Sequence, residues 1–410
     1  MASDAWAPDI AGAAGPKYKA VTAAIAAAVA RGELRHGDRL PPQRDLAAQL
    51  GIDLTTVTKA YDLARQPMAS ALAALARGDG IARLHYQRPG GAGADRESGA
   101  ELLRRVSLSS DPEQIVVTAG AQNGLHAIAS TILKPGDRVA CGDHVYPGFR
   151  AIARRMGVSL VPLAAISARA LEAAHADAPL RALYIVPTND NPTALTVPAE
   201  ERKAIAKWAR DAGVQIVEDD AYGLLPDVPI PAITSFAPEI GWYIASMAKI
   251  VSPALRVGFV RAPSVADAMQ LASCQHESAV MAPPLNAAMI SLWLADGTFD
   301  VLVDAVRKEA AWRQKLARTI LGDGGHAAHP QGYHLWLPLA DDSHPETLAA
   351  ALALDGLSGV PSDRFAVAPD AAKAMRISLG GTIDRRTLSR ALHRLAAQLW
   401  SPGGAPSNIV

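Results

Sequence analysis

One lysine lies where its amine could act as a nucleophile. Lys249 stands in the segment YIASMAKIVSPALRVGFV, which is otherwise uncharged until Arg256, seven residues further on. A lysine in weakly polar surroundings has a lowered amine pKa, and this favours imine formation with a carbonyl compound. Taken alone, the segment is more typical of a surface lysine whose stem lies against apolar neighbours. Other residues of the chain favour the first interpretation.

Polar side chains follow two apolar runs of the chain. Asp219 and Asp220 end the run VQIVEDD, and Asn191 in PTNDNPT ends the apolar run before it. A carboxylate at the end of a strand could keep a pyridinium nitrogen protonated.

A glycine turn and a tyrosine suggest two further contacts. Gly120, Ala121 and Gln122 form a strand-to-helix turn in VTAGAQNG, where free backbone N–H groups could bind phosphate. Such turns are common in α/β proteins, so this signal is weak alone. Tyr146 in DHVYPG follows another strand and could stack on a ring. By itself it is more typical of a half-buried structural tyrosine.

The elements that must position these residues alternate between strands and helices. From Gln114 onward, apolar runs such as ALYIVPT are separated by helical segments such as ERKAIAKWARDAG. This alternation predicts an α/β fold with a mostly parallel sheet, and a site at the carboxyl ends of its strands. From about Asp300, a helix, strands at YHLWLPL and MRISLG and a final helix predict a smaller α+β lobe.

The segments ahead of this sheet are helical. Residues 16–66 predict three short helices with Gly51 in a tight turn before the last, which is a helix-turn-helix pattern. MASALAALARG then predicts another helix. HYQRPGGAGADRESG carries four glycines and predicts a loop, after which a helix resumes at AELLRR.

Composition excludes several classes of protein. The 410 residues carry 40 basic and 40 acidic side chains, so the chain is not basic throughout and any nucleic-acid contact must be local. The two cysteines, Cys141 and Cys274, exclude a disulfide scaffold and a tetrahedral thiolate site. We expect no metal site, because we find no partner at metal-ligand spacing for His334 or His393. The acidic N-terminus MASDAWAPDI and the lack of a long apolar run predict a cytoplasmic protein without a membrane span.

From about residue 79 to 400, these motifs in this order resemble the fold-type-I aminotransferases, which bind pyridoxal phosphate (PLP). The resemblance implies that Lys249 forms the internal aldimine with PLP and moves the proton at the substrate α-carbon. Asp219 would pair with the pyridine nitrogen. Tyr222 and Asn191 would hydrogen-bond the phenolic oxygen of the ring, and Tyr146 would stack on it.

The same resemblance implies contacts to phosphate, to substrate and between subunits. Arg376 in AMRISLGG would bind a substrate carboxylate through its two-pronged guanidinium. Tyr86 in HYQRPGG would reach the phosphate of the partner subunit, which implies a homodimer. The phosphate group would be held by Ser246, Arg256 and the turn of Gly120, Ala121 and Gln122.

Three positions depart from the family pattern. Ala248 replaces the second serine before the lysine, so one polar group of the phosphate site is absent. Ala194 replaces the glycine of the Asn-Pro-Thr-Gly turn. His144 and Val145 replace the acid-proline pair before the stacking tyrosine.

The N-terminal segment GELRHGDRLPPQRDLAAQLGIDLTTVTKAYDLAR resembles the DNA-reading half of a GntR-type winged helix. Such a head before an aminotransferase-like domain resembles the MocR subfamily of regulators, which bind PLP and DNA. The resemblance implies that Arg44, Thr55, Thr56 and Lys59 face double-stranded DNA. We expect this head over residues 1–66. The PLP domain would then cover 67–410, with a large lobe of about 105–298 and a small lobe of about 299–410.

The head departs from its family in two ways. Asp53 and Leu54 stand where a Ser-Arg pair usually starts the recognition helix, and no β-hairpin wing or long linker follows the third helix. Residues 16–66 carry eight basic and five acidic side chains, so their net charge of +3 supports only a few phosphate contacts. The segment could instead be a helical appendage without DNA binding.

Three functions are open at this point. The first hypothesis is a transcriptional regulator whose DNA binding is modulated by PLP or by a PLP–amino compound aldimine. The alternative is a PLP-dependent aminotransferase that acts on an amino acid and carries a vestigial DNA-binding head. The third is a protein that binds PLP without turnover and without DNA.

Overall fold

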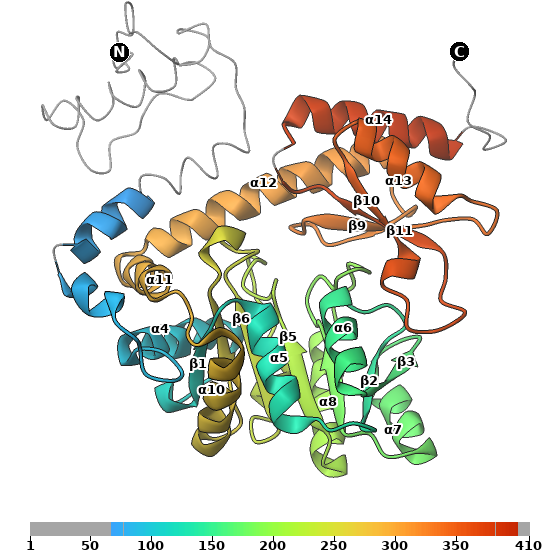
Figure 1. Cartoon of the computed structure of the whole chain (residues 1–410). Coiled ribbons are helices and arrows are strands. Elements are labelled where there is room, and N and C mark those ends of the chain that lie inside the picture. The colour runs from blue at the N-terminus through green and yellow to red at the C-terminus, as the bar shows by residue number, and fades with distance from the viewer. Residues whose placement is uncertain (1–66, 77, 382, 401–410) are drawn as a thin grey trace, which may run out of the picture. The chain divides into compact units, whose positions relative to one another are not determined.

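A sheet of seven strands is the centre of the larger lobe (Figure 1). The computed structural model describes residues 67–76, 78–381 and 383–400, so the predicted DNA contacts Arg44, Thr55, Thr56 and Lys59 lie outside the described residues. Strand β7 runs antiparallel to both of its neighbours, and the remaining pairs are parallel, which confirms the predicted mostly parallel sheet. In spatial order the strands are β1 (Ile115–Thr118), β7 (Gly258–Arg261), β6 (Gly241–Ser246), β5 (Gln215–Asp219), β4 (Ala182–Ile185), β2 (Arg138–Gly142) and β3 (Ser159–Leu163).

Helices cover both faces of this sheet. Strands β1, β4 and β6 are buried at every position, as expected for strands with helices on each side. One face carries α5 (Ala121–Ile132), α6 (Pro147–Met156) and α10 (Val265–Ala279). The other face carries α4 (Gly93–Leu103), α7 (Ala168–Asp177), α8 (Ala199–Ala212), α9 (Ile233–Phe236) and α11 (Pro284–Asp296).

The smaller lobe has its own antiparallel sheet and its own apolar core. Its strands, in spatial order, are β10 (Ser358–Pro361), β11 (Ala374–Ser378), β9 (His334–Pro338) and β8 (Ala327–Ala328). Helices α12 (Thr298–Leu321), α13 (Pro345–Leu354) and α14 (Arg385–Trp400) pack side chains into this core. Five short 3₁₀ helices complete the described elements: η1 (Asp79–Leu84), η2 (Arg104–Val106), η3 (Pro112–Gln114), η4 (Pro253–Leu255) and η5 (Ser362–Arg364).

The helix predicted after Gln66 is confirmed over residues 67–76, but the predicted glycine loop is wrong in its second half. Helix α4 begins at Gly93, seven residues before the predicted start at Ala100. Gly99 lies inside α4 at a position where the packing leaves room only for a small residue. A Cβ at Gly99 would lie 2.6 Å from the ring of Phe259. Tertiary packing therefore outweighs the low helix propensity of glycine.

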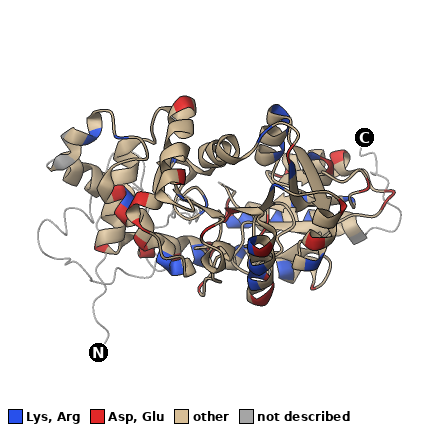
Figure 2. Ribbon diagram, turned by 90° about the horizontal axis from the view of Figure 1, so that it is seen from below, with Lys and Arg blue, Asp and Glu red and all other residues tan. Residues whose placement is uncertain are grey.

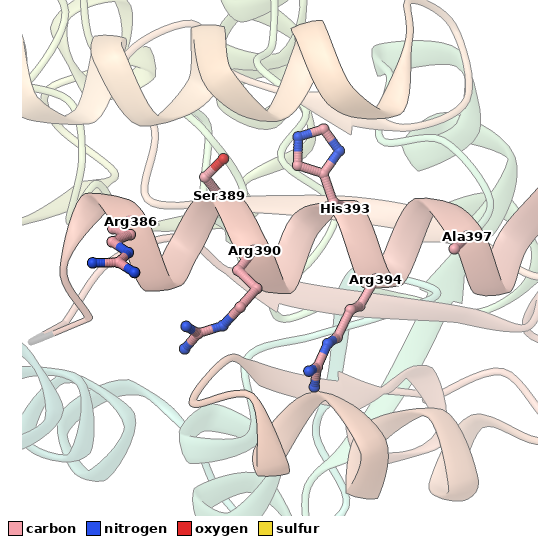
Figure 3. Close-up of a pocket in the computed structure, with 6 residues that line it drawn as sticks. All are labelled: Arg386, Ser389, Arg390, His393, Arg394 and Ala397. Carbon is pink, nitrogen blue, oxygen red and sulfur yellow. The ribbon is translucent and has the colours of Figure 1, made fainter. Parts of the chain in front are cut away.

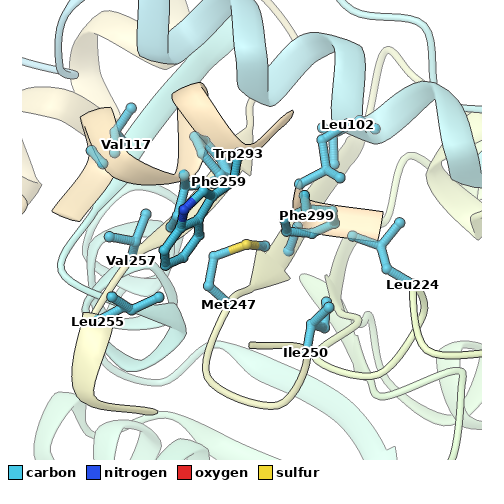
Figure 4. Close-up of a cluster of buried hydrophobic side chains, with 14 of the residues drawn as sticks. Leu102, Val117, Leu224, Met247, Ile250, Leu255, Val257, Phe259, Trp293 and Phe299 are labelled. Atoms are coloured by element: carbon cyan, nitrogen blue, oxygen red, sulfur yellow. The ribbon is translucent and has the colours of Figure 1, made fainter. Parts of the chain in front are cut away.

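An apolar cluster holds the turn that carries Lys249. Met247 and Ile250 are fully buried on either side of the lysine, and Leu255 and Val257 continue the cluster after the turn (Figure 4). Trp293 and other side chains of α4, α11 and α12 pack against them. Because Met247 and Ile250 fill the cluster on both sides of Lys249, the lysine side chain faces away from it.

Cys141 and Cys274 are both free thiols. Among the described residues, no helix combines the length and the apolar character needed to cross a bilayer.

Candidate active site and family

Asp219 ends β5 with one carboxylate oxygen unsatisfied. The Tyr184 hydroxyl donates to Oδ2 at 3.1 Å, while Oδ1 is buried without a partner in the described part of the chain. Burial raises the pKa of Asp219 to about 6, although the Tyr184 hydrogen bond opposes this shift. An unpartnered buried acceptor costs free energy. A cationic N–H group placed here would remove that cost.

The carboxylates of the two neighbouring acids accept hydrogen bonds from other groups of the protein. Glu218 accepts hydrogen bonds from the backbone N–H groups of Ile233 and Thr234, both at 2.8 Å. Asp220 accepts at Oδ2 from the Tyr243 hydroxyl at 3.1 Å, while its Oδ1 is also buried without a partner among the described residues. Successive strand residues point to opposite faces, so Asp219 is the acid of this run that faces the site.

Two tyrosines lie near Asp219. Burial raises the pKa of both Tyr146 and Tyr222, and the charge of Asp219 raises it further. Tyr146 precedes the first residue of α6. Tyr222 is buried, with its ring centre 6.3 Å from that of Tyr333. The two predicted ring contacts therefore share the electrostatic environment of Asp219.

The first turn of α5 presents backbone N–H groups that no side chain caps. The helix begins after Gly120, whose φ is +82°. Arg256 donates from Nη2 to the carbonyl of Ala119 at 3.4 Å, so its guanidinium lies at this helix start. A Cβ at Gly120 would lie 3.0 Å from Arg256 Nη2, and one at Gly258 would lie 3.2 Å from the Ala121 nitrogen. Free N–H groups, the positive helix end and an arginine together suit a phosphate.

Residues around this turn complete the predicted phosphate site only in part. Ser246 ends β6 and is buried, and its Oγ accepts from the N–H of Ala248 at 3.3 Å. Gln122 donates from its side chain to the Gly148 carbonyl at 3.3 Å. A Cβ at Gly148 would lie 2.3 Å from both Gln122 and the Tyr146 ring, so glycine allows these groups to approach.

Lys249 opens onto a cavity of about 270 Å³. The cavity is also lined by Tyr333 and Gly380 from the small lobe. The Tyr333 hydroxyl donates to the Lys249 carbonyl oxygen at 2.7 Å, which ties the turn to the small lobe. Desolvation, and then the positive charge of Arg376, lower the pKa of the Lys249 amine. A larger neutral fraction makes this amine a better nucleophile.

Arg376 on β11 meets Asn191 across the two lobes. Its Nη1 donates to Asn191 Oδ1 at 2.7 Å, and its guanidinium carbon lies 5.1 Å from the centre of the Phe365 ring. Its Nε is buried without a partner in the described chain. Burial lowers the pKa of Arg376. The guanidinium thus keeps one donor without a partner among the described residues.

Tyr86 stands apart from the other predicted site residues. Its side chain is 84% exposed and makes no hydrogen bond or ring contact with another described residue. The predicted role of Tyr86 in a partner subunit stays a prediction.

Sequence reasoning missed three groups that support the site. Tyr184 donates to Asp219, and Tyr333 donates to the Lys249 carbonyl. His334 Nε2 lies 2.9 Å from the Asp190 carbonyl oxygen, and burial lowers the pKa of His334 to about 4, so its neutral ring donates there. The signal for Tyr184 was its phenol within an apolar strand, because a buried hydroxyl requires a partner.

The structure shows how the chain accommodates two of the three departures from the family pattern. Ala194 adopts φ +59°, the left-handed conformation that glycine would take without strain. His144 packs edge-on against Trp336, with ring centres 5.0 Å apart, and the Val145 N–H donates to the Phe365 carbonyl at 2.9 Å. The loop before Tyr146 is therefore held by the segment after η5.

Comparison with known families now decides the class of the domain. The sequence profile of aminotransferase class I and II matches residues 52–395. The chain belongs to this family. A second profile, that of the GntR family of bacterial regulatory proteins, matches residues 17–80. The two matches overlap over residues 52–80, so the domain boundary at residue 66 stays a prediction.

Relatives of this family member include regulators and an enzyme. The chain is 25% identical to the uncharacterized HTH-type transcriptional regulator YdeF of Bacillus subtilis, over 91% of the chain and 92% of the relative. It is 26% identical to the vitamin B6 salvage pathway transcriptional repressor PtsJ of Salmonella typhimurium (88% and 94%). It is also 26% identical to the 2-aminoadipate transaminase of Thermus thermophilus (82% and 86%). The predicted resemblance to GntR-type regulators with an aminotransferase-like domain is confirmed.

A solved structure agrees with the fold. The α-aminoadipate aminotransferase LysN of Thermus thermophilus, solved with a phosphopyridoxyl-leucine adduct, superposes with a TM-score of 0.72 at 24% identity, over 81% of this chain and 87% of LysN. The family confirms the prediction of PLP as the cofactor. The residues present fit PLP, because an unsatisfied Asp219 oxygen, an uncapped helix start beside Arg256 and the Lys249 amine occur in one lobe.

Proposed function

We propose that the protein is a PLP-binding transcriptional regulator whose DNA affinity changes when PLP, or PLP combined with an amino compound, occupies the large lobe. The observation that supports this most is the GntR match at residues 17–80, ahead of the class I and II aminotransferase match. Two relatives aligned over most of the chain are named as transcriptional regulators. We further propose a cytoplasmic homodimer in which Arg44, Thr55, Thr56 and Lys59 face DNA.

The residues of the large lobe have separate roles in this proposal. PLP, when bound, supplies an electron-withdrawing pyridine ring and an aldehyde that reacts with amines. Asp219 would hold a proton on the ring nitrogen, while Tyr146, Tyr222 and Asn191 would orient the ring. Lys249 would anchor the cofactor, and Arg376 would select ligands that carry a carboxylate.

The phosphate would be fixed by the start of α5. Ser246 and Arg256 would hold it together with the backbone of Gly120, Ala121 and Gln122. Tyr86 would reach the same group in the other subunit.

Capture of sheared genomic DNA tests the proposed function. Purified protein with and without PLP is incubated with the fragments at near-physiological salt, and the retained DNA is sequenced. We expect one or a few enriched loci, with an enrichment that PLP changes, because the ligand must contact two states of the protein differently. The same enrichment with and without PLP would leave a DNA-binding protein and reject regulation by PLP.

The second candidate is an aminotransferase with a vestigial head. The observation in its favour is that Lys249, Asp219, Asn191 and Arg376 are all present and that Asn191 and Arg376 are in direct contact. An enzyme would convert bound PLP to its pyridoxamine form with an amino donor, and a keto acid would restore the spectrum. No spectral change over a broad panel of amino acids would reject turnover. No activity in either assay would leave a PLP-binding protein without turnover or DNA binding.

A further inference from the structure

The last helix carries a one-sided row of arginines. Helix α14 buries Leu388, Ala391, Leu392 and Leu395 completely in the core of the small lobe. Its other side exposes Arg386, Arg390 and Arg394, which we call the arginine row. These residues recur every four positions, so they follow one another along the helix at intervals of about 6 Å.

The row has few counter-charges. Arg394 pairs with Asp355, but neither Arg386 nor Arg390 forms a side-chain hydrogen bond or ion pair with another described residue. Residues 385–400 contain no aspartate or glutamate, and the carboxylate of Asp384, which precedes them, accepts hydrogen bonds from Thr387. Elsewhere on the ribbon, acidic and basic side chains are interspersed (Figure 2), and the formal net charge of the whole chain is zero. The arginine row is therefore a local excess of positive charge.

The surface around the row is open along the helix. A hollow of about 570 Å³ is lined by Arg386, Ser389, Arg390, His393, Arg394 and Ala397, all of which belong to α14 (Figure 3). Among the described residues, only α14 lines this hollow, so a small anion would be held from one side. An extended polyanion could lie along it and meet several of these groups at once.

We propose that the arginine row of α14 binds the sugar-phosphate backbone of duplex DNA. Phosphates recur about every 3.4 Å of axis along each strand, and the row spans about 12 Å, so it can meet three or four of them. Guanidinium groups bind phosphate oxygens in a two-pronged geometry, and the Ser389 hydroxyl can add one donor. These contacts carry no sequence information.

This inference rests on the proposed function, since a regulator supplies the duplex. The arginine row would also add positive charge to that of the head, because residues 16–66 have a net charge of only +3. The arginine row would add sequence-independent affinity to whatever sequence reading the head performs. The number of phosphates contacted can be measured, because each one steepens the dependence of affinity on salt.

The test compares two double variants of the full chain on a labelled random-sequence duplex. R386Q/R390Q removes the two unpaired members of the row and keeps side chains that favour helices. R154Q/R155Q is the matched control, because Arg154 and Arg155 are exposed in the last turn of α6 and the loss of charge is equal. Affinity is measured over a range of salt concentrations. Thermal unfolding and the visible absorbance of bound PLP verify that each variant is folded.

We expect the slope of log K against log salt to become shallower by about 2 in R386Q/R390Q, and to stay near the wild-type value in the control. Equal slopes in the wild type and R386Q/R390Q would overturn the proposal. So would equal losses in both variants, which would indicate a general charge effect, or a wild type that does not bind the duplex. An equal loss of affinity for polyglutamate would show that the row takes any polyanion and would also overturn the assignment to DNA.

Genomic capture with the same variants separates this inference from the proposed function. Enriched loci that persist in R386Q/R390Q with an unchanged salt slope would keep the regulator and reject the arginine row. Loss of binding to random duplex in R386Q/R390Q, with no locus enriched by the wild type, would keep the arginine row and reject the regulator.

Discussion

Replacement of Lys249 by alanine should abolish the visible absorbance of PLP bound covalently to the protein. Lys249 lines a cavity of about 270 Å³, and desolvation and the charge of Arg376 lower the pKa of its amine, which favours a bond with an aldehyde. The expected loss is complete under each of the three candidate functions. It therefore tests the site independently of the biological role.

The measurement combines spectra with chemical mapping. Borohydride reduces an imine to a stable amine, so a digest of the wild type should carry the pyridoxyl group on the peptide that contains Lys249. The matched control is Lys134→Ala, which removes an exposed lysine and should leave the absorbance unchanged. Thermal unfolding of Lys249→Ala should be close to that of the apo wild type. Absorbance retained in Lys249→Ala, or a label on another peptide, would reject the assignment of Lys249.

Patterns local in sequence predicted much of the large lobe. The apolar run before Asp219 is β5, and the glycine turn before Ala121 is the start of α5. Both were predictable because a buried parallel strand is continuously apolar and because a strand-to-helix turn requires unusual backbone angles. The carboxyl ends of parallel strands lie at one edge of a sheet, so the residues that follow them could be assigned to one site.

Contacts between distant residues were not predictable. Arg376 and Asn191 are 185 positions apart, and their hydrogen bond depends on how the two lobes pack. The hydroxyl of Tyr184 reaches Asp219 because two neighbouring strands have a particular register, which one sequence does not reveal. The start of α4 was misplaced for a similar reason, since Gly99 is specified by the distant Phe259 ring.

Replacement of Asp219 by asparagine should weaken PLP binding by about 2–5 kcal/mol, the usual cost of removing one member of a buried hydrogen-bonded charge pair, or at least about 30-fold in affinity. The amide keeps the shape of the side chain but cannot neutralise a protonated ring nitrogen. Tyr184→Phe is a milder variant of the same site, because it removes the donor to Asp219 Oδ2 and leaves the carboxyl in place. We expect its affinity to lie between those of the wild type and Asp219→Asn. Equal affinities in all three proteins would reject the pairing.

The pH dependence of stability tests the same carboxyl without relying on PLP affinity. In the apo protein, burial raises the pKa of Asp219 from its ordinary value of 3.8 to about 6, so the folded state holds this proton more tightly than the unfolded state. The protonated carboxyl of Asp219 therefore contributes to the free energy of unfolding. This contribution is fully present below about pH 4 and is lost as the pH rises to about 6, and the total loss is about 3 kcal/mol. The difference in free energy of unfolding between the apo wild type and Asp219→Asn should decline over this range.

Bound PLP should change that profile. A protonated ring nitrogen beside Asp219 lowers the pKa of the carboxyl, so the holo wild type should retain its stability relative to the apo protein as the pH rises from about 4 to 6. Comparison with the variant is necessary because Asp190 is also buried with a pKa raised to about 6, and its charge raises the pKa of Asp219. A purely structural role of Asp219 would give the same pH profile with and without PLP, and that outcome would contradict the assignment.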